Sequence, residues 1–219
     1  QIGSGNYNIV KVGSEIVGEQ EAEFSNFIGY RAGSASRHQA YTNAIGYLAG
    51  SGAVGTIVGG KNNFIGWLTG RGSSGDYNSF LGYAAGAQTD ISDSVAIGIG
   101  PFSSSKNINE SNAIGNQAAY GSSGILMSDI IGRWAGYQAS AIWWSLMAGP
   151  SAGYLAHNVN WSVNLGYGAG ARAFDSTSDV LIGTSCGSAA SGTSQLVAIG
   201  DNCAYGMSGI ERSIAIGWE

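Results

Sequence analysis

The chain of 219 residues is 44% hydrophobic and only 11% charged, with 37 glycines, 2 prolines and a net charge of −5. This hydrophobic content excludes a disordered chain, and the scarcity of proline excludes a collagen-like one. The basic residues form no cluster of the kind that binds a nucleic-acid duplex, and no apolar run approaches the length of a membrane span. We therefore expect a folded protein with neither nucleic-acid binding nor membrane insertion.

Residues 1–24 lack the pattern that governs the rest of the chain. Their four glutamates, Glu15, Glu19, Glu21 and Glu23, are typical of a solvated surface. We predict an irregular lead-in over residues 1–24 and one repeat domain over residues 25–219. Because the sequence stops inside a repeat, we expect the chain to be a piece of a longer protein or a processed product.

From residue 25 onward one motif recurs: a small residue, two variable residues, Ile or Leu, and then Gly. The motif glycines are separated by 17, 20, 16 and 16 residues and then seven times by 17. So regular a period indicates a repeat protein. The motif glycines are Gly29, Gly46, Gly66, Gly82, Gly98, Gly115, Gly132, Gly149, Gly166, Gly183, Gly200 and Gly217.

A unit of about 17 residues is too short to bury a core alone, so successive units must stack. Alternating residues before the glycine indicate a short strand, and a second strand and a polar loop follow it. We predict an all-β fold, a parallel β-roll or β-solenoid with about 12 coils of 16–20 residues. Each aligned position then becomes a ladder that runs along the stack.

Two aligned columns are predicted to form the core. The third residue after the glycine is always small or compact, usually Ala or Cys, and should lie inside where space is short. Three residues before the glycine, Asn26, Asn43 and Asn63 should form a ladder of side-chain amides. The residue just before the glycine is the predicted apolar spine, which comprises Ile28, Ile45, Ile65, Leu81, Ile97, Ile114, Ile131, Leu165, Ile182, Ile199 and Ile216.

Period-2 alternation predicts that the residue two before the glycine faces away from this spine. Many aromatic residues occupy that column and the column just after the glycine. Exposed apolar stripes of this length normally mark a contact surface, so we expect them to pack between subunits. The interface candidates are Phe27, Phe64, Phe80, Tyr30, Tyr47, Trp67 and Tyr83.

The motifs Ser94-Val95-Ala96-Ile97-Gly98 and Ser213-Ile214-Ala215-Ile216-Gly217 resemble the head repeats of trimeric autotransporter adhesins. That resemblance implies a left-handed roll assembled as a homotrimer. The aromatic variants, such as Asn26-Phe27-Ile28-Gly29-Tyr30-Arg31-Ala32-Gly33, look more like repeats of phage tail fibres. The strict 17-residue period departs from the shorter, Ala-rich adhesin coil, and neither an adhesin's stalk and anchor nor a fibre's chaperone domain is present in this sequence.

The resemblance favours a fibrous virion protein, a segment of a phage tail fibre or spike that recognises a receptor on the host surface. The receptor would be a cell-surface glycan or protein, and the fibre would lie on the virion. The first alternative is the head of a bacterial adhesin on the cell surface, and the second is a purely structural fibre shaft. Flanking sequence would separate the fibre from the adhesin.

Aromatic and amide side chains gather in the loops of the middle coils. Flat rings can receive the C–H face of a sugar, and amides can bind its hydroxyls, so these residues are candidates for glycan contact. The alternative is that the same rings pack between subunits or cover the end of the core on the loop side. The candidates are Trp143, Trp144, Trp161, Tyr120, Tyr137, Tyr154, His157, Asn158 and Asn160.

Catalytic chemistry has weak support in the sequence. The two histidines, His38 and His157, are several coils apart, so we expect no metal site, and no motif indicates a cofactor. Asp175, Asp179 and Asp201 could pair as in a glycosidase, but Asp179 occupies a column of Ser, Thr and Asn that is typical of turns. We expect a non-enzymatic protein, with Cys186 and Cys203 as buried free thiols in the small inward column.

Overall fold

The computed structural model describes residues 10–12, 25–36, 41–54 and 61–218. These residues form short strands and turns, and each strand pairs in parallel with the equivalent strand of a neighbouring coil. The predicted parallel β-solenoid is thereby confirmed, with about eleven turns roughly 17 residues apart. The described residues contain no helix long and apolar enough to cross a membrane.

Most of the predicted lead-in, residues 1–9 and 13–24, lies outside the described residues, as does His38. Residues 10–12, however, form a strand, β1 (Val10–Val12), which pairs in register with β2 (Asn26–Ile28). The strand ladder therefore includes residues before the boundary predicted at residue 25.

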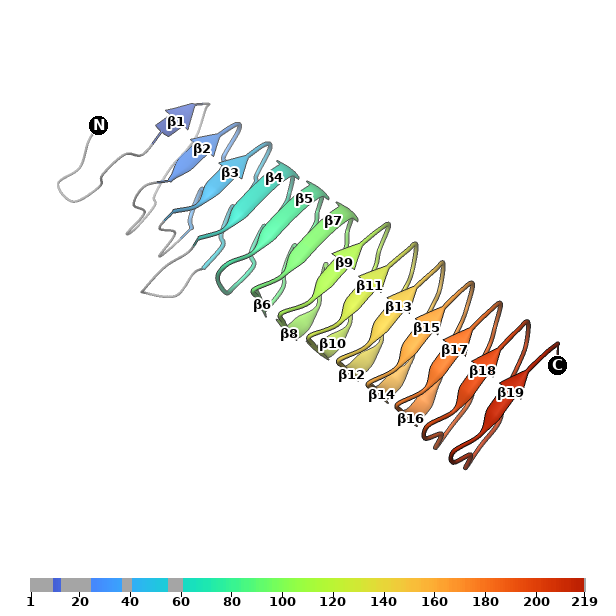
Figure 1. The fold of residues 1–219 in the computed structure, drawn as a ribbon. Coiled ribbons are helices and arrows are strands. Elements are labelled where there is room, and N and C mark those ends of the chain that lie inside the picture. Colours follow the sequence, from blue (N-terminus) through green and yellow to red (C-terminus); the bar gives the residue numbers. More distant parts are fainter. Residues whose placement is uncertain (1–9, 13–24, 37–40, 55–60, 219) are drawn as a thin grey trace. The chain divides into compact units, whose positions relative to one another are not determined.

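The chain divides into two compact units, residues 1–105 (unit 1) and 106–219 (unit 2). Unit 1 contributes six parallel strands to one sheet, which we call the first sheet, and the short strand β6 (Ile91–Ser92) to a second sheet (Figure 1). The six strands are β1, β2, β3 (Asn43–Ile45), β4 (Asn63–Trp67), β5 (Ser79–Tyr83) and β7 (Val95–Ile99).

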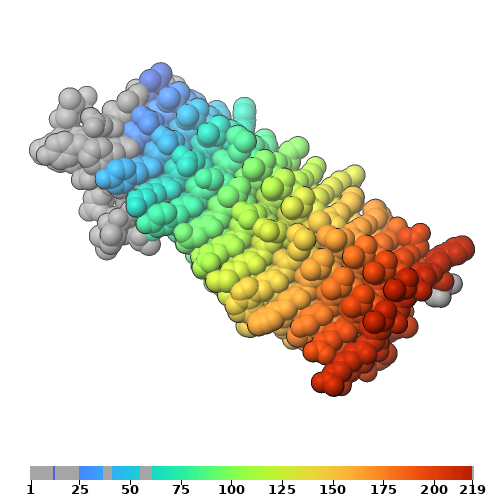
Figure 2. All heavy atoms as spheres, viewed as in Figure 1, coloured from blue at the N-terminus to red at the C-terminus, as the bar shows by residue number. Residues whose placement is uncertain are grey.

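Unit 2 is more regular, and its coils appear as parallel rows of side chains in the space-filling view (Figure 2). Its first-sheet strands are β9 (Asn112–Ile114), β11 (Asp129–Ile131), β13 (Leu146–Ala148), β15 (Val163–Leu165), β17 (Val180–Ile182), β18 (Val197–Ile199) and β19 (Ile214–Ile216). Its second-sheet strands are β8 (Lys106–Asn109), β10 (Ser123–Leu126), β12 (Ser140–Trp143), β14 (His157–Asn160) and β16 (Phe174–Thr177).

One coil shows the path of the chain in unit 2. Strand β11 ends just before the motif glycine, Gly132, and a turn stretch over residues 133–138 leads into β12. A corner at Trp144 and Ser145 then returns the chain to β13 in the first sheet. Residues 17 apart consequently lie side by side in neighbouring coils.

The core is formed by the residue two before the motif glycine, which we call the core column. Phe27, Phe64 and Phe80 are at most 1% exposed, as are their equivalents in unit 2, such as Met147 and Leu181. In the three-residue strands β2, β13 and β17 only the central side chain is fully buried. The prediction that these phenylalanines face a partner subunit is therefore wrong, because they fill the inside of their own coils.

The residue just before the glycine, the predicted spine, lies on the outer face of the first sheet and is not core. Side chains alternate along a strand, so an error of one residue in phase moves a whole column to the other face. Ile28, Leu165 and Ile182 are half-buried. The other members are 36–72% exposed, and they are Ile45, Ile65, Leu81, Ile97, Ile114, Ile131, Ile199 and Ile216.

The size of most core-column side chains is matched by the fourth residue after the glycine, the spacer column. A Cβ atom added to Gly33 or Gly86 would come within 2.2 Å of the ring of Phe27 or Phe80, respectively. In the coil of Gly98 the sizes are exchanged, since Ala96 occupies the core column and the buried Phe102 the spacer column. The predicted small inward column, from Ala32 to Cys203, is buried throughout.

The motif glycine recurs because its backbone leaves no room for a side chain. Gly132 has a φ of 132°, which residues with a Cβ atom rarely adopt. A Cβ at this position would also lie only 2.6 Å from the carbonyl oxygen of Gly149 in the next coil. Each motif therefore places glycine where only a residue without a side chain permits close stacking of the coils.

Side-chain ladders connect successive coils. The predicted amide ladder is confirmed, because Asn26 Nδ2 donates to Asn43 Oδ1 at 2.7 Å and Asn43 Nδ2 donates to Asn63 Oδ1 at 2.9 Å. At the corners of unit 2, Ser145 Oγ accepts a hydrogen bond from the Ser162 backbone N–H at 3.2 Å. Such bonds satisfy buried backbone donors at the turns.

Candidate functional site

Three tyrosines form an outward-facing column in unit 2, at the fifth residue after each motif glycine, which we call the tyrosine column. The ring centroids of Tyr120 and Tyr137 lie 5.5 Å apart, and those of Tyr137 and Tyr154 lie 5.4 Å apart. The ring planes differ by only 10–12°. The column continues with Ala171 and Ser188, so the row of rings ends at Tyr154.

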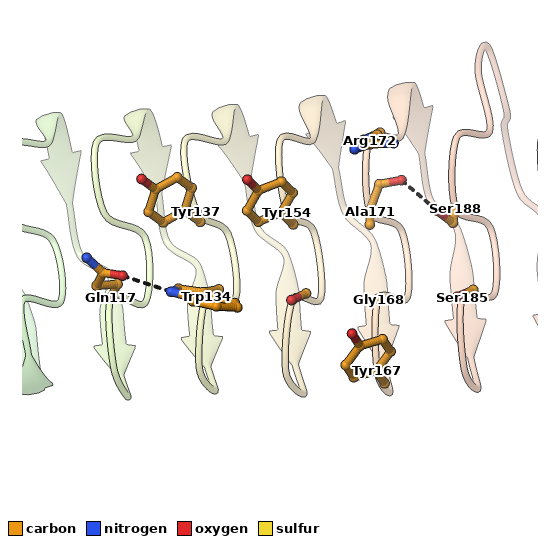
Figure 3. Close-up of a pocket in the computed structure, with 11 residues that line it drawn as sticks. Gln117, Trp134, Tyr137, Tyr154, Tyr167, Gly168, Ala171, Arg172, Ser185 and Ser188 are labelled. Atoms are coloured by element: carbon orange, nitrogen blue, oxygen red, sulfur yellow. Dashed lines mark hydrogen bonds between the residues drawn. The ribbon is translucent and has the colours of Figure 1, made fainter.

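A groove of about 580 Å³ runs beside this column, across the turn stretches of successive coils (Figure 3). Tyr137, Tyr154, Ala171 and Ser188 lie along one side of it, and Gln117, Trp134, Gly168 and Ser185 lie along the other. Tyr167, Ser151 and Arg172 complete the lining. The volume lies in the range typical of small-molecule sites. Beyond Tyr154 and Trp134 the two rows of the lining continue with small side chains, such as Ala171 and Ser151.

Trp134 is held in place from two directions. Its indole Nε1–H donates to Gln117 Oε1 at 2.8 Å, and the guanidinium carbon of Arg133 lies 3.9 Å from the centre of its ring system. The wall of the groove is therefore pre-organised, which lowers the entropic cost of binding a ligand. Trp134 was not predicted from the sequence, although its spacing of 17 from Gln117 could have indicated the pair.

Arg172 is the one charged residue that lines the groove, and no carboxylate lines it. Its backbone N–H donates to Tyr154 O at 2.7 Å, but its guanidinium makes no hydrogen bond or ion pair with any described residue. The other two arginines of unit 2 are engaged, Arg133 with Trp134 and Arg212 with Gln195 Oε1 at 3.3 Å. Arg172 thus provides free hydrogen-bond donors and a positive charge at the groove.

The tryptophans of the predicted site lie elsewhere, where the second-sheet strands β12 and β14 end. Trp144 and Trp161 contact each other edge to face at 4.9 Å, and Trp143 contacts Trp144 in the same way at 6.4 Å. All three are 44–50% exposed, and Trp144 and Trp161 line a shallow hollow. The structure therefore separates these rings from the tyrosines of the groove.

The polar candidates His157, Asn158 and Asn160 lie on β14 and contact their neighbours. The His157 ring is stacked on Phe174 at 5.0 Å. Asn158 Nδ2 donates to Asp175 Oδ1 at 2.6 Å, and Asn160 Nδ2 donates to Asn158 Oδ1 at 3.2 Å. Of the nine predicted residues, two line the groove, Tyr137 and Tyr154, and Tyr120 extends their column.

The acidic residues considered for catalysis have separate partners. Asp175 accepts from Asn158, and Asp201 Oδ1 accepts from the Thr184 backbone N–H at 3.2 Å. Asp179 is buried and accepts from Thr193 Oγ1 and from the Leu196 backbone N–H, which is the turn role expected of its column. Burial raises the pKa of this carboxyl group. No group of three or more metal-binding side chains occurs among the described residues.

The two cysteines are buried free thiols in neighbouring coils, as predicted. Cys186 Sγ contacts Ala198 O at 3.1 Å, and Cys203 Sγ contacts Ala215 O at 3.1 Å. Burial raises the pKa of Cys186 to about 11, so its thiol stays protonated at neutral pH. A protonated, buried thiol is a poor nucleophile.

Unit 1 carries a different aromatic row, at the residue just after the motif glycine. The rings of Tyr30 and Tyr47 are stacked at 5.0 Å, and those of Tyr47 and Trp67 at 4.4 Å. Tyr47, Trp67 and Tyr83 are 38–51% exposed, so this predicted outward column does face away from the core.

No protein-family model, curated protein or solved structure matches the chain.

Proposed function

We propose that the chain is a segment of a non-enzymatic, trimeric virion fibre that attaches to saccharides on the host surface. The observation that carries this proposal is the groove of unit 2, which combines aromatic rings with hydroxyl and amide groups. The β-solenoid provides a rigid support, because every coil is fixed to its neighbours by strand pairing and side-chain ladders.

A saccharide suits this groove on chemical grounds. The axial C–H groups of a sugar ring pack on aromatic faces such as those of Tyr137 and Tyr154, while hydroxyls exchange hydrogen bonds with Ser, Gln and Tyr side chains. The groove crosses five coils, from Gln117 to Ser185, which at about 4.8 Å per coil amounts to roughly 19 Å. It is therefore longer than one sugar ring and can hold an oligosaccharide.

Self-association is supported by the outer face of the first sheet. The Ile and Leu residues just before each motif glycine form an exposed apolar stripe in each unit. Such a stripe normally marks a contact with another chain. Three copies are expected from the resemblance to adhesin heads and tail fibres, and three grooves per fibre would convert weak binding into avidity.

The head of a bacterial adhesin is the second candidate, favoured by the motif Ser94-Val95-Ala96-Ile97-Gly98. The groove and the apolar stripe would serve both proteins in the same way. The aromatic motifs around Phe27, Phe64 and Phe80 favour the fibre. A third possibility, a shaft that binds no receptor, is an outcome of the experiment below.

The test is binding of the chain to a glycan array and to host cells, with sedimentation of each variant in the ultracentrifuge. Tyr154→Ala should abolish binding and leave the trimer intact. Tyr205→Ala is the matched control, since Tyr205 shares the tyrosine column but does not line the groove. Ile131→Lys on the outer sheet face should yield monomers, whereas Ser123→Lys on the second sheet should not.

Each result has a definite meaning for the proposal. A trimeric wild-type chain that binds no glycan and no host cell would be a shaft, and the receptor-binding proposal would fail. If Tyr154→Ala disrupted the trimer instead, the tyrosines would be part of the interface. If Ile131→Lys stayed trimeric, the outer sheet face would not be the contact surface.

A further inference from the structure

The row of tyrosine rings stops in the middle of the groove. Tyr137 covers one face of Tyr154, but the next residue of the tyrosine column is Ala171, so no ring covers the opposite face. The space above Ala171 is bordered by Gly168 and Ser185 on the far side of the groove (Figure 3). A six-membered ring placed on the open face of Tyr154, at the spacing of about 5.4 Å that the tyrosines adopt, would lie in this space as the next member of the row.

Arg172 follows Ala171 directly and lies at the same part of the groove (Figure 3). Its guanidinium is without a partner among the described residues, and no carboxylate of the lining competes for it. A guanidinium binds a carboxylate through two parallel hydrogen bonds and binds a sulfate group in a similar way. The only other arginine beside the groove, Arg133, is stacked on Trp134, so Arg172 is the positive group of the lining that remains available to an anionic group.

We infer that the groove is selective for acidic saccharides, with a sugar ring on the open face of Tyr154 above Ala171 and its anionic group paired with Arg172. This inference rests on the proposed function and adds the class of ligand and the residue that selects it. Tyr154 provides affinity for any sugar ring, whereas Arg172 distinguishes an acidic ring from a neutral one. Trp134 and Tyr167 contact the neighbouring sugars of the same oligosaccharide.

The charge is tested by two matched substitutions to glutamine. Arg172→Gln reproduces Gln138, which occupies the same position two coils earlier with a similar backbone φ of 50°. Arg212→Gln reproduces Gln195 and removes a positive charge of the same kind outside the groove. On an array with uronic acids, sialic acids, sulfated sugars and neutral sugars, Arg172→Gln should bind its acidic ligand about tenfold or more weakly. Arg212→Gln should bind like the wild type.

The position of the sugar ring is tested independently of the charge. Ala171→Tyr extends the row of tyrosines into the proposed sugar site and should abolish binding, while thermal unfolding stays close to that of the wild type. Ala171→Ser reproduces Ser188 of the same column and should retain binding. If Ala171→Tyr folded normally and still bound the saccharide, the proposed position of the ring would be wrong.

The array distinguishes failure of this inference from failure of the proposed function. Preference for carboxylated or for sulfated sugars over neutral ones supports the inference, and the two arms identify the anionic group. Binding to neutral sugars that Arg172→Gln leaves unchanged would overturn the inference but keep the saccharide-binding function. Absence of binding to every saccharide, together with absence of host-cell binding, would overturn both.

Discussion

Unit 1 and unit 2 share one backbone repeat but place their aromatic residues in opposite ways. In the described part of unit 1, the core column contains three phenylalanines beside Ala44 and Ala96, and one outward column carries the stacked rings of Tyr30, Tyr47 and Trp67. In unit 2 the core column is aliphatic except for Asn164, and aromatic rings gather in outward columns of the turn stretch and at the corners.

This difference shows which columns the fold constrains and which it leaves free. The motif glycine and the small inward residues are common to both units, because stacking requires them. Outward columns tolerate Ser, Arg, Ala or Tyr in the same place. A groove arises in unit 2 because large rings are replaced by small side chains from one coil to the next. Tyr154 is followed by Ala171 in the tyrosine column, and Trp134 is followed by Ser151 at the second residue after the motif glycine.

The largest effect on stability is expected where side chains of the core column meet residues of the spacer column. Gly86→Ala in unit 1 would place Cβ 2.2 Å from the Phe80 ring, whereas Gly136→Ala in unit 2 would place it 3.0 Å from Ile130 Cδ1. Both glycines have a φ near 60°, so the backbone cost is shared. We expect Gly86→Ala to lower the free energy of unfolding by about 3 kcal/mol or more, and Gly136→Ala by about 1–2 kcal/mol.

Urea unfolding followed by circular dichroism measures both values. Gly206→Ala isolates the backbone cost, because a Cβ there would meet no atom within 4 Å. The double variant Phe80→Ala/Gly86→Phe, which reproduces the arrangement of Ala96 and Phe102, should be more stable than Gly86→Ala alone. Equal losses for Gly86→Ala and Gly136→Ala would show that the size of the core residue does not matter.

The same size relation could have corrected the sequence prediction of the core. The period, the strand and the glycine turn follow from spacing alone, and the structure agrees with them. Alternation, however, does not say which of two columns faces inward when both are apolar. A large residue in one column accompanies a small residue in the other, as in the pairs Phe80 with Gly86 and Ala96 with Phe102. Such compensation is typical of side chains that meet inside a core.

A smaller effect on stability is expected at Asn164, a polar residue in the core column. The described part of unit 1 has no polar residue in that column. Its side chain is fully buried between the coils of Met147 and Leu181, and both its amide nitrogen and its oxygen lack a hydrogen-bond partner in the chain. Asn164→Leu removes this cost and reproduces the pair of Leu181 with Gly187 one coil further. We expect a gain of about 1–3 kcal/mol in the free energy of unfolding.

Thermal and urea unfolding of Asn164→Leu, beside Met147→Leu, provide the measurement. Met147→Leu exchanges apolar side chains of similar volume and should change stability by less than about 1.5 kcal/mol. A loss of stability in Asn164→Leu would mean that the amide has a partner, such as a buried water molecule. Asn164 would then be a structural residue of unit 2 that stabilises its core.

The candidate site was predictable only in part, because its residues are distant in sequence and belong to different columns. The tyrosine column was visible as Tyr120, Tyr137 and Tyr154 at a spacing of 17. Which columns border one groove depends on how the turn stretch folds, and no periodicity reveals that. For this reason Trp143, Trp144 and Trp161 were grouped with the tyrosines, whereas Trp134 and Arg172 were missed.

The smallest effect on stability concerns the residue four before each motif glycine, which we call the corner column. In the described part of unit 1 this column contains only neutral side chains, such as Asn62, Asn78 and Ser94. In unit 2 the same column includes Asp179, whose pKa burial raises above its ordinary value of 3.8. The folded state therefore binds this proton more tightly than the unfolded state. Stability is highest below pH 3.8 with respect to this group, and it falls as pH rises through the folded-state pKa.

Asp179→Asn should remove this dependence on pH. The amide can still accept from the Leu196 N–H and donate to Thr193 Oγ1, but it carries no charge to bury. At pH 7 we expect the variant to be more stable by about 1 kcal/mol or less, and near pH 3 to match the wild type. Urea unfolding between pH 3 and pH 8 measures the difference, with Asp175→Asn at an exposed position as the control. A wild-type advantage at pH 7 would mean that the hydrogen bonds of the charged carboxylate outweigh its burial, which would reverse the sign of the argument.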